Sequence, residues 1–125
     1  MAFVLHITTD AEWRASVAAG SHRPASLERE GFIHCSTYDQ AAGTATKYFA
    51  GRTDLVLLCI DEARVAAPIR YEPPASAAPP GVDRDPRADQ RFPHLYGPLA
   101  PEAVVRVIAF PPGPDGRFRV PAGLP

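Results

Sequence analysis

The sequence has 125 residues, of which 46% are hydrophobic and 22% are charged. This length and composition fit one globular domain with its own hydrophobic core. The 13 basic and 14 acidic residues give a net charge of −1. That balance argues against a broad electrostatic surface for nucleic acid or for an acidic membrane, although a local patch that holds an RNA end remains compatible with it.

The sequence also indicates a cellular location. The N-terminal residues lack the basic and apolar regions of a signal peptide, and no apolar run approaches the ~18 residues of a membrane span. The two cysteines, Cys35 and Cys59, provide no disulfide framework. We therefore expect a cytoplasmic protein that does not interact with membranes.

The first elements follow from periodicity and capping. Alternating residues over 3–8 predict the first strand. Residues 9–12 have capping-box spacing and predict a helix start, after which Trp13 and Val17 would form the buried stripe. Gly20 is expected to end this helix.

A second strand and helix follow in the same order. Residues 26–30 predict one helical turn, and residues 31–36 predict a strand that carries Phe32, His34 and Ser36 on one face. Residues 37–40 repeat the capping-box spacing, so a helix should run to about residue 50. Its inward-facing residues would be Ala41, Ala45, Tyr48 and Phe49.

The remaining strands are shorter. Residues 55–60 are apolar on both faces, which is typical of a central strand. Residues 69–72 and 94–96 predict short strands, Pro101 suits the first turn of a brief helix, and residues 104–110 predict the last strand. The sum is an α+β domain over residues 1–110, with about five or six strands and two main helices.

Proline is the compositional oddity, with 15 residues that gather in two stretches. Residues 73–91 have no predicted structure, and loops of this length are commonly lids or binding loops. We expect this loop to be mobile beside the functional cleft. Residues 111–125 are expected to be a Pro/Gly-rich tail outside the core.

Three of the four histidines lie in predicted strands: His6, His34 and His94. A ring among apolar neighbours needs partners for its nitrogens, so three such placements indicate a shared polar cleft. The alternative is that each is a structural histidine with its own partner. The fourth, His22, lies in a polar loop and is expected to be solvated.

Three strings carry a resemblance: HITT at residues 6–9, GFIHCST at 31–37 and FPHLYGPL at 92–99. Together they resemble the signature segments of the bacterial domain of unknown function family 952. The resemblance extends over residues 3–110. That family has no established activity, so it implies a fold and a position for the cleft but no reaction.

The order of elements also resembles the ADP-ribosyltransferase fold, in particular the poly-ADP-ribose polymerase group. This resemblance implies a small split β-sheet and NAD, or a related nucleotide, as ligand or substrate. In that fold the first-strand histidine binds the ribose and the next backbone unit holds the nicotinamide amide, positions that His6 and Ile7 occupy here. The second-strand tyrosine of that fold stacks on nicotinamide, and here Ile33 or His34 takes its place.

One departure from that fold concerns its catalytic glutamate, which would fall near Phe92, where this sequence has no carboxylate. His94 is the nearest group able to transfer protons. RNA 2′-phosphotransferases share the fold and use arginine and histidine in place of glutamate, which draws attention to Arg84, Arg87 and Arg91. If the protein is an enzyme, the resemblance implies an NAD-dependent or nucleotide-directed transferase or glycohydrolase that lacks the usual catalytic glutamate.

These observations define the candidate site. The candidate catalytic residues are His34 and His94, and the candidate ligand-binding residues are His6, Ile7, Thr8, Ser36, Thr37 and Tyr96. No metal is expected, because the histidines lack short-range ligand spacing, although a three-histidine zinc site is the alternative. Cys35 is adjacent to His34 and points to the opposite face, so it is not the expected nucleophile. The competing function is a small-molecule binding module, or a biosynthetic enzyme with a non-nucleotide ligand.

Overall fold

The computed structural model describes residues 2–74, 90–122 and 124–125. In chain order the helices and strands are β1 (Phe3–Thr9), α1 (Asp10–Ala19), α2 (Ala25–Glu30), β2 (Ile33–His34), α3 (Tyr38–Tyr48), β3 (Leu55–Asp61), β4 (Ile69–Glu72), β5 (Phe92–Leu95) and β6 (Val104–Ala109). Short 3-10 turns lie at Glu62–Arg64 and Pro101–Ala103.

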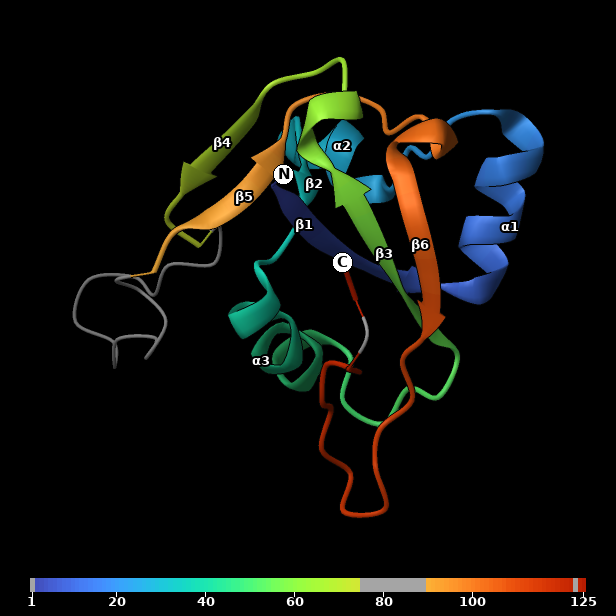
Figure 1. The fold of residues 1–125 in the computed structure, drawn as a ribbon, viewed down its shortest axis with the longest axis vertical. Helices are drawn as coiled ribbons and strands as arrows, with labels where there is room; N and C mark the ends of the chain where they lie inside the picture. The colour runs from blue at the N-terminus through green and yellow to red at the C-terminus, as the bar shows by residue number, and fades with distance from the viewer. Residues whose placement is uncertain (1, 75–89, 123) are drawn as a thin grey trace.

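The strands form two antiparallel three-stranded sheets, in the orders β1-β3-β6 and β2-β5-β4 (Figure 1). The predicted α+β class is confirmed, with α1 and α3 as the main helices. Within the part of the chain that the structure describes, no helix combines the length and apolar character of a membrane span.

Both main helices begin where the capping patterns predict. Thr9 caps α1 by accepting a hydrogen bond from the Glu12 N–H, and Gly20 ends α1 with a φ of 79°, a conformation that favours glycine. Thr37 and Gln40 form the predicted capping box of α3.

Two predicted core residues of these helices are exposed. Val17 is 51% exposed, because α1 presents Trp13 and Ser16 to the core and Val17 lies on its outer side. Tyr48 is also exposed, because it lies in the last turn of α3 at the rim of a cavity, whereas Ala41 and Ala45 are buried as predicted.

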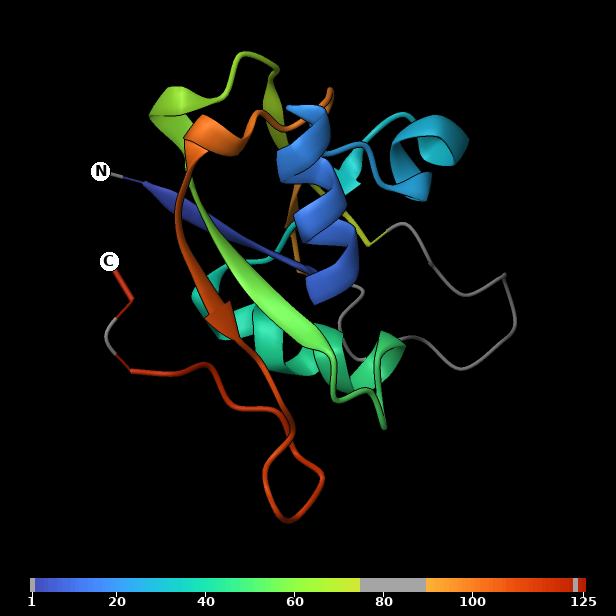
Figure 2. The same cartoon turned by 90° about the vertical axis from the view of Figure 1, so that its right-hand side faces the viewer.

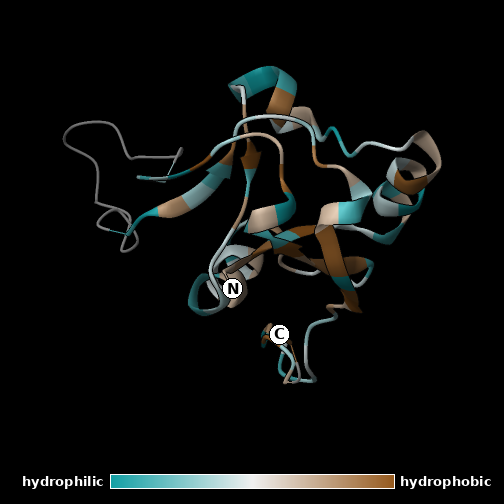
Figure 3. Ribbon diagram, turned by 45° about the horizontal axis from the view of Figure 1, so that its top comes forward, coloured by the Kyte–Doolittle hydropathy of each residue, from teal (hydrophilic) through white to brown (hydrophobic). Residues whose placement is uncertain are grey.

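Strand β3 is buried along its whole length between β1 and β6, which confirms the predicted central strand. Its alternate side chains enter two separate hydrophobic clusters. Val56, Leu58 and Ile60 pack on the side of Trp13, and Leu55 and its odd-numbered neighbours pack on the side of α3. Figure 2 shows α1 and α3 on opposite sides of this sheet, and Figure 3 shows hydrophobic colour concentrated on its strands.

The second predicted strand is shorter than expected, because the chain changes partners within it. Only Ile33–His34 is a regular strand, paired with β5. At Ser36 the backbone instead exchanges two hydrogen bonds with Leu5 of β1, at 2.8 and 2.7 Å. The segment 33–36 therefore joins the two sheets, and the predicted strands one and two lie side by side at this point.

The C-terminal segment is not the tail outside the core that the prolines suggested. Phe118 is only 4% exposed, and its ring lies 5.3 Å from that of Phe110, centre to centre, within the α3-side cluster. The Tyr38 hydroxyl donates to the Pro125 carbonyl at 2.6 Å. Prolines and glycines shape the turn at 113–117, but the apolar residues after it return to the core. Residues 75–89 of the predicted mobile loop lie outside the described residues, so that prediction stays open.

The buried position of Phe118 leads to a stability prediction. Phe118→Ala removes a ring from a packed cluster, so the free energy of unfolding should fall by roughly 3 kcal/mol. Urea denaturation measures this difference. Val107→Ala on the exposed side of β6 is the matched control and should change it by less than about 1 kcal/mol. Equal effects of the two substitutions would contradict a core role for the C-terminal segment.

Candidate functional site

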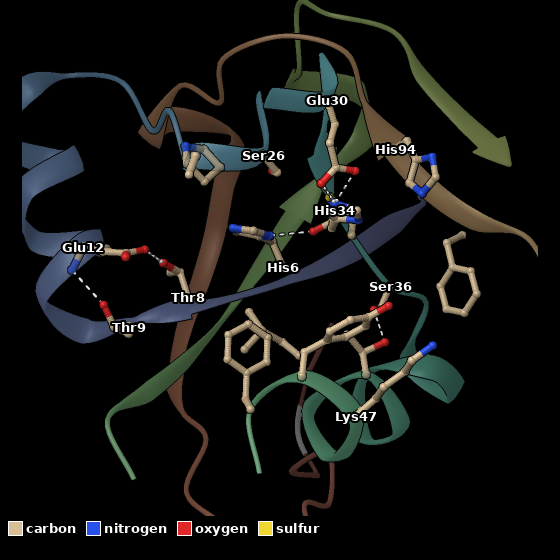
Figure 4. A pocket seen from close by; sticks show the side chains of 18 of the residues that line it. His6, Thr8, Thr9, Glu12, Ser26, Glu30, His34, Ser36, Lys47 and His94 are labelled. Atoms are coloured by element: carbon tan, nitrogen blue, oxygen red, sulfur yellow. Dashed lines mark hydrogen bonds and ion pairs between the residues drawn. The ribbon is translucent and has the colours of Figure 1, made fainter. Parts of the chain in front are cut away.

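A cavity of about 550 Å³ opens beside the junction of the two sheets (Figure 4). Its wall combines side chains from β1, α1, α2, the 33–36 segment, the end of α3 and β5. His6, His34 and His94 all line it, which confirms that the three strand histidines share one cleft. The volume is within the usual range of small-molecule sites.

His6 is buried, at 6% exposure, and both of its ring nitrogens are hydrogen bonded. Nδ1 lies 2.6 Å from the His34 carbonyl oxygen, and Nε2 lies 3.0 Å from His22 Nε2. Because a carbonyl can only accept, Nδ1 carries the hydrogen and Nε2 presents a lone pair. Burial, and then the nearby His22 ring, lower the pKa of His6 to about 3, so His6 is neutral at physiological pH.

His22 is not the solvated loop residue that the sequence suggested, because it is only 1% exposed. Its backbone N–H donates to the Leu99 carbonyl and its carbonyl accepts from the Leu99 N–H, and this pairing holds the loop beneath α1. The ring is hydrogen bonded to His6 through Nε2 and to the Ser16 hydroxyl through Nδ1, at 2.7 Å. Burial lowers the pKa of His22, so a neutral ring is favoured here as well.

His94 is buried at the cavity wall and paired with a carboxylate. Its Nδ1 lies 2.9 Å from Glu72 Oε1, and the Tyr96 hydroxyl donates to the same oxygen. These bonds, that of Tyr96 first, lower the pKa of Glu72. Burial outweighs the carboxylate and lowers the pKa of His94, so the neutral ring donates from Nδ1 and keeps a lone pair on Nε2. The Phe32 ring stacks on it at 4.1 Å, centre to centre.

The carboxylate that the sequence lacks near Phe92 is supplied by the neighbouring strand. In the β4–β5 ladder Glu72 lies directly opposite Phe92. The sequence places no carboxylate near Phe92 along the chain, and the structure brings Glu72 opposite that position from β4. Strand pairing across the 73–91 segment carries this information, and no spacing within the sequence indicates it.

His34 forms a second carboxylate–histidine pair with different surroundings. Its Nε2 lies 3.1 Å from both carboxylate oxygens of Glu30. The His34 side chain is 43% exposed, so this pair is in contact with water. His34 and His94 are directly opposite each other in the β2–β5 ladder, with ring centres 5.7 Å apart.

The other predicted ligand-binding residues divide into two groups. Ile7, Thr8 and Ser36 line the cavity, where Thr8 donates to Glu12 and Ser36 shares a hydrogen bond with Thr44. Thr37 and Tyr96, both among the described residues, lie outside the cavity wall. Thr37 caps α3, and the Tyr96 hydroxyl donates a hydrogen bond to Glu72. Direct ligand contact is therefore not favoured for these two residues.

Metal binding and cysteine chemistry find little support in this geometry. In residues 2–74, 90–122 and 124–125, no group of three or more His, Cys, Asp or Glu side chains is placed to hold a metal ion. Burial raises the pKa of Cys35 to about 12, so its sulfur is a protonated thiol and a poor nucleophile. Of the arginines that drew attention, Arg84 and Arg87 lie outside the described residues.

Sequence reasoning missed the partners of the histidines: Ser16, His22, Glu30 and Glu72. The spacing of four residues between Glu30 and His34 was a usable signal for their contact. It was not recognised because helix α2 ends at Gly31, between the two residues. Nothing local indicates the other three. Their roles arise from the pairing of the His22 loop with Leu99 and of β4 with β5.

A family model described as a protein of unknown function, DUF952, matches residues 7–107. The chain belongs to this family. It is similar to the protein CC0527 of Caulobacter crescentus, whose crystal structure superposes with a TM-score of 0.73 at 32% identity, over 94% of each chain. The solution NMR structure of the same protein gives a TM-score of 0.73 at 33% identity, over 94% of this chain and 91% of that one. No curated protein matches the chain.

The low pKa of His6 leads to a prediction about acid stability. The unfolded ring takes up a proton near pH 6.5, whereas the folded ring does so only near pH 3. The stability that depends on neutral His6 is thus fully present above pH 6.5 and is lost as the pH falls towards 3. Between pH 6.5 and 5, His6 alone should lower the free energy of unfolding by about 2 kcal/mol, measurable by urea denaturation.

The matched variant for this measurement is His6→Gln, whose side-chain oxygen can still accept from His22 but does not titrate. Its loss of stability over the same pH range should be smaller than that of the parent by about 2 kcal/mol. His34→Gln removes the half-exposed imidazole of the same cavity and is the control. Parallel pH profiles for the parent and His6→Gln would show that His6 is not the titrating group.

Proposed function

We propose that the cavity is the active site of an enzyme that binds a phosphate-bearing, nucleotide-like small molecule and transfers protons through His94 and His34. The observation that carries the proposal is the pair of carboxylate–histidine contacts, Glu72–His94 and Glu30–His34, whose rings lie 5.7 Å apart at the wall of one cavity.

The two pairs suit complementary steps of acid–base chemistry. Glu72 holds the Nδ1–H of His94 and Phe32 stacks on its ring, so the lone pair on Nε2 has a defined direction. This neutral, oriented ring suits a general base. His34 faces Glu30 and is open to water, which gives its imidazole the access to solvent and to a leaving group that proton delivery requires.

The remaining lining supports a nucleotide-like ligand. Three basic side chains and three aromatic side chains lie in the cavity wall. Basic groups suit phosphate, and aromatic rings suit a planar base or nicotinamide. These residues are Arg29, Lys47 and Arg52, and Tyr48, Phe49 and Phe92.

NAD is the finer form of the proposal, and it rests on the resemblance to the ADP-ribosyltransferase fold. Glu72 adds support, because it provides a carboxylate beside His94. One adjustment follows from the contacts of His6. Both of its nitrogens are already bonded within the protein, so the ribose contact implied by the resemblance would pass to other groups of the wall, such as Thr8 and Glu12.

A binding module without catalysis is the second candidate, and the burial of His94 favours it. A ring that is nearly inaccessible and hydrogen bonded to Glu72 also serves to stabilise a fold. The two candidates differ in one measurable respect. A binding module would take up the ligand without converting it, and substitution of His94 would change affinity alone.

The test is an NMR titration of the parent protein with NAD, ADP-ribose and nicotinamide, followed by product analysis. We expect the imidazole signals of His34 and His94 to move on binding. His94→Gln should retain binding within a few-fold and slow any conversion by roughly 10²–10⁴-fold, the usual contribution of a general base. His34→Gln should have a similar effect.

The control is Glu102→Gln, an exposed substitution in the short turn before β6. It should leave binding and conversion unchanged. If none of the three nucleotide ligands binds to the parent, the nucleotide class is wrong. If both histidine variants fold and convert the ligand at the parental rate, the proton-transfer roles are wrong.

A further inference from the structure

His34 is located in a strand of only two residues, so its orientation depends on what lies on either side of it. On one side it pairs with His94 of β5. On the other side its carbonyl accepts the short hydrogen bond from His6 Nδ1, at 2.6 Å. Just beyond, Ser36 pairs with Leu5. The peptide group that follows His34 is thereby held in place by hydrogen bonds to residues of β1.

His6 is in turn held by groups that lie behind the cavity. Its Nε2 accepts from His22 Nε2 at 3.0 Å, and His22 Nδ1 lies 2.7 Å from the Ser16 hydroxyl on α1. The Ser16 hydroxyl is also placed to donate to the Glu12 carbonyl oxygen, at 2.9 Å. A hydroxyl has one hydrogen, so these two acceptors compete for it. The Glu12 carbonyl also accepts the backbone N–H of the helix ladder, whereas the lone pair on His22 Nδ1 needs this hydrogen when His22 Nε2–H faces His6, so we assign the hydrogen to His22.

The hydrogen bonds therefore run in one direction. Ser16 donates to His22 Nδ1, His22 Nε2–H donates to His6 Nε2, and His6 Nδ1–H donates to the His34 carbonyl. With neutral rings, only this choice of tautomers satisfies all three contacts. Reversing either ring would place two lone pairs or two hydrogens against each other in a buried site, which is costly.

The geometry points to Ser16, His22 and His6 as positioning residues for His34. They connect helix α1 to the backbone of His34, the proposed proton-transfer group, although neither Ser16 nor His22 contacts His34 itself. The functional meaning of this inference rests on the proposed role of His34. The hydrogen-bond chain itself is testable without any ligand, so the two can fail separately.

The test begins with the tautomers of the parent protein, read from the ¹⁵N chemical shifts of the imidazoles at neutral pH. We expect His6 to carry its hydrogen on Nδ1 and His22 to carry its hydrogen on Nε2. This measurement requires no substitution. The opposite tautomer at either ring overturns the inference, whatever happens to the variants.

Ser16→Ala then removes the first donor. We expect the His22 tautomer to become mixed, the His34 ring signal to shift and broaden, and amide exchange at Ser36 to rise by about fivefold to tenfold, as the loss of one hydrogen bond allows. Ser16→Thr keeps the hydroxyl and should restore the parental spectrum. A merely structural effect on stability would not be restored selectively at the His34 ring.

The matched control is Thr46→Ala on α3, which removes a hydroxyl bonded to a helix carbonyl at 3.0 Å, the same type of contact as that of Ser16 with Glu12. It should leave all the histidine signals unchanged. If Ser16→Ala and Thr46→Ala give the same histidine spectrum as the parent, Ser16 does not position His34. Failure of NAD to bind to the parent bears only on the proposed function, and a change at His34 in Ser16→Ala supports the hydrogen-bond chain in either case.

Discussion

The site depends on one buried imidazole that has a partner on each side. His6 lies in β1, and through its two nitrogens it contacts the His22 loop and the backbone of His34. The first sheet, the second sheet and the loop beneath α1 meet at this ring. A buried histidine with both nitrogens satisfied is compatible with a packed core, whereas one with a missing partner is not. The arrangement of the neighbouring segments is thus constrained by the hydrogen-bonding capacity of a single side chain.

Burial then determines the charge of the histidines. Loss of water lowers the pKa of His6, His22 and His94, so neutral rings are favoured close to one another and to the hydrophobic cluster around Trp13. Charged rings would repel each other there. The negative charge of Glu72 is accommodated because the Tyr96 hydroxyl and His94 both donate to it.

The two carboxylate–histidine pairs contain the same chemical groups in different surroundings. In the His94 pair the ring is buried beneath Phe32 and Glu72 is partly exposed, whereas both side chains of the His34 pair are in contact with water. Exposed contacts of this type contribute little to stability, so the Glu30 contact adds little to the free energy of folding. The Glu72 contact fixes the orientation of the His94 ring, whereas the His34 ring is open to water.

The sequence by itself determined the elements and most of their faces. Capping patterns before α1 and α3, the apolar run of β3 and the alternation in β1 depend on neighbours in the chain, and each is found as predicted. Membership of the family was also visible in three short strings. The convergence of the three strand histidines followed from their placement among apolar residues, which requires partners for the ring nitrogens.

Only the tertiary structure decided which partners those nitrogens have. His22 looked solvated because its loop is locally polar, and it is buried because Leu99 pairs with that loop. Glu72 reaches the site through the register of β4 with β5, and Phe118 joins the core after a turn that looked like a tail. These contacts join residues distant in sequence. Pairing register and chain return depend on how the whole core packs, and no local pattern encodes them.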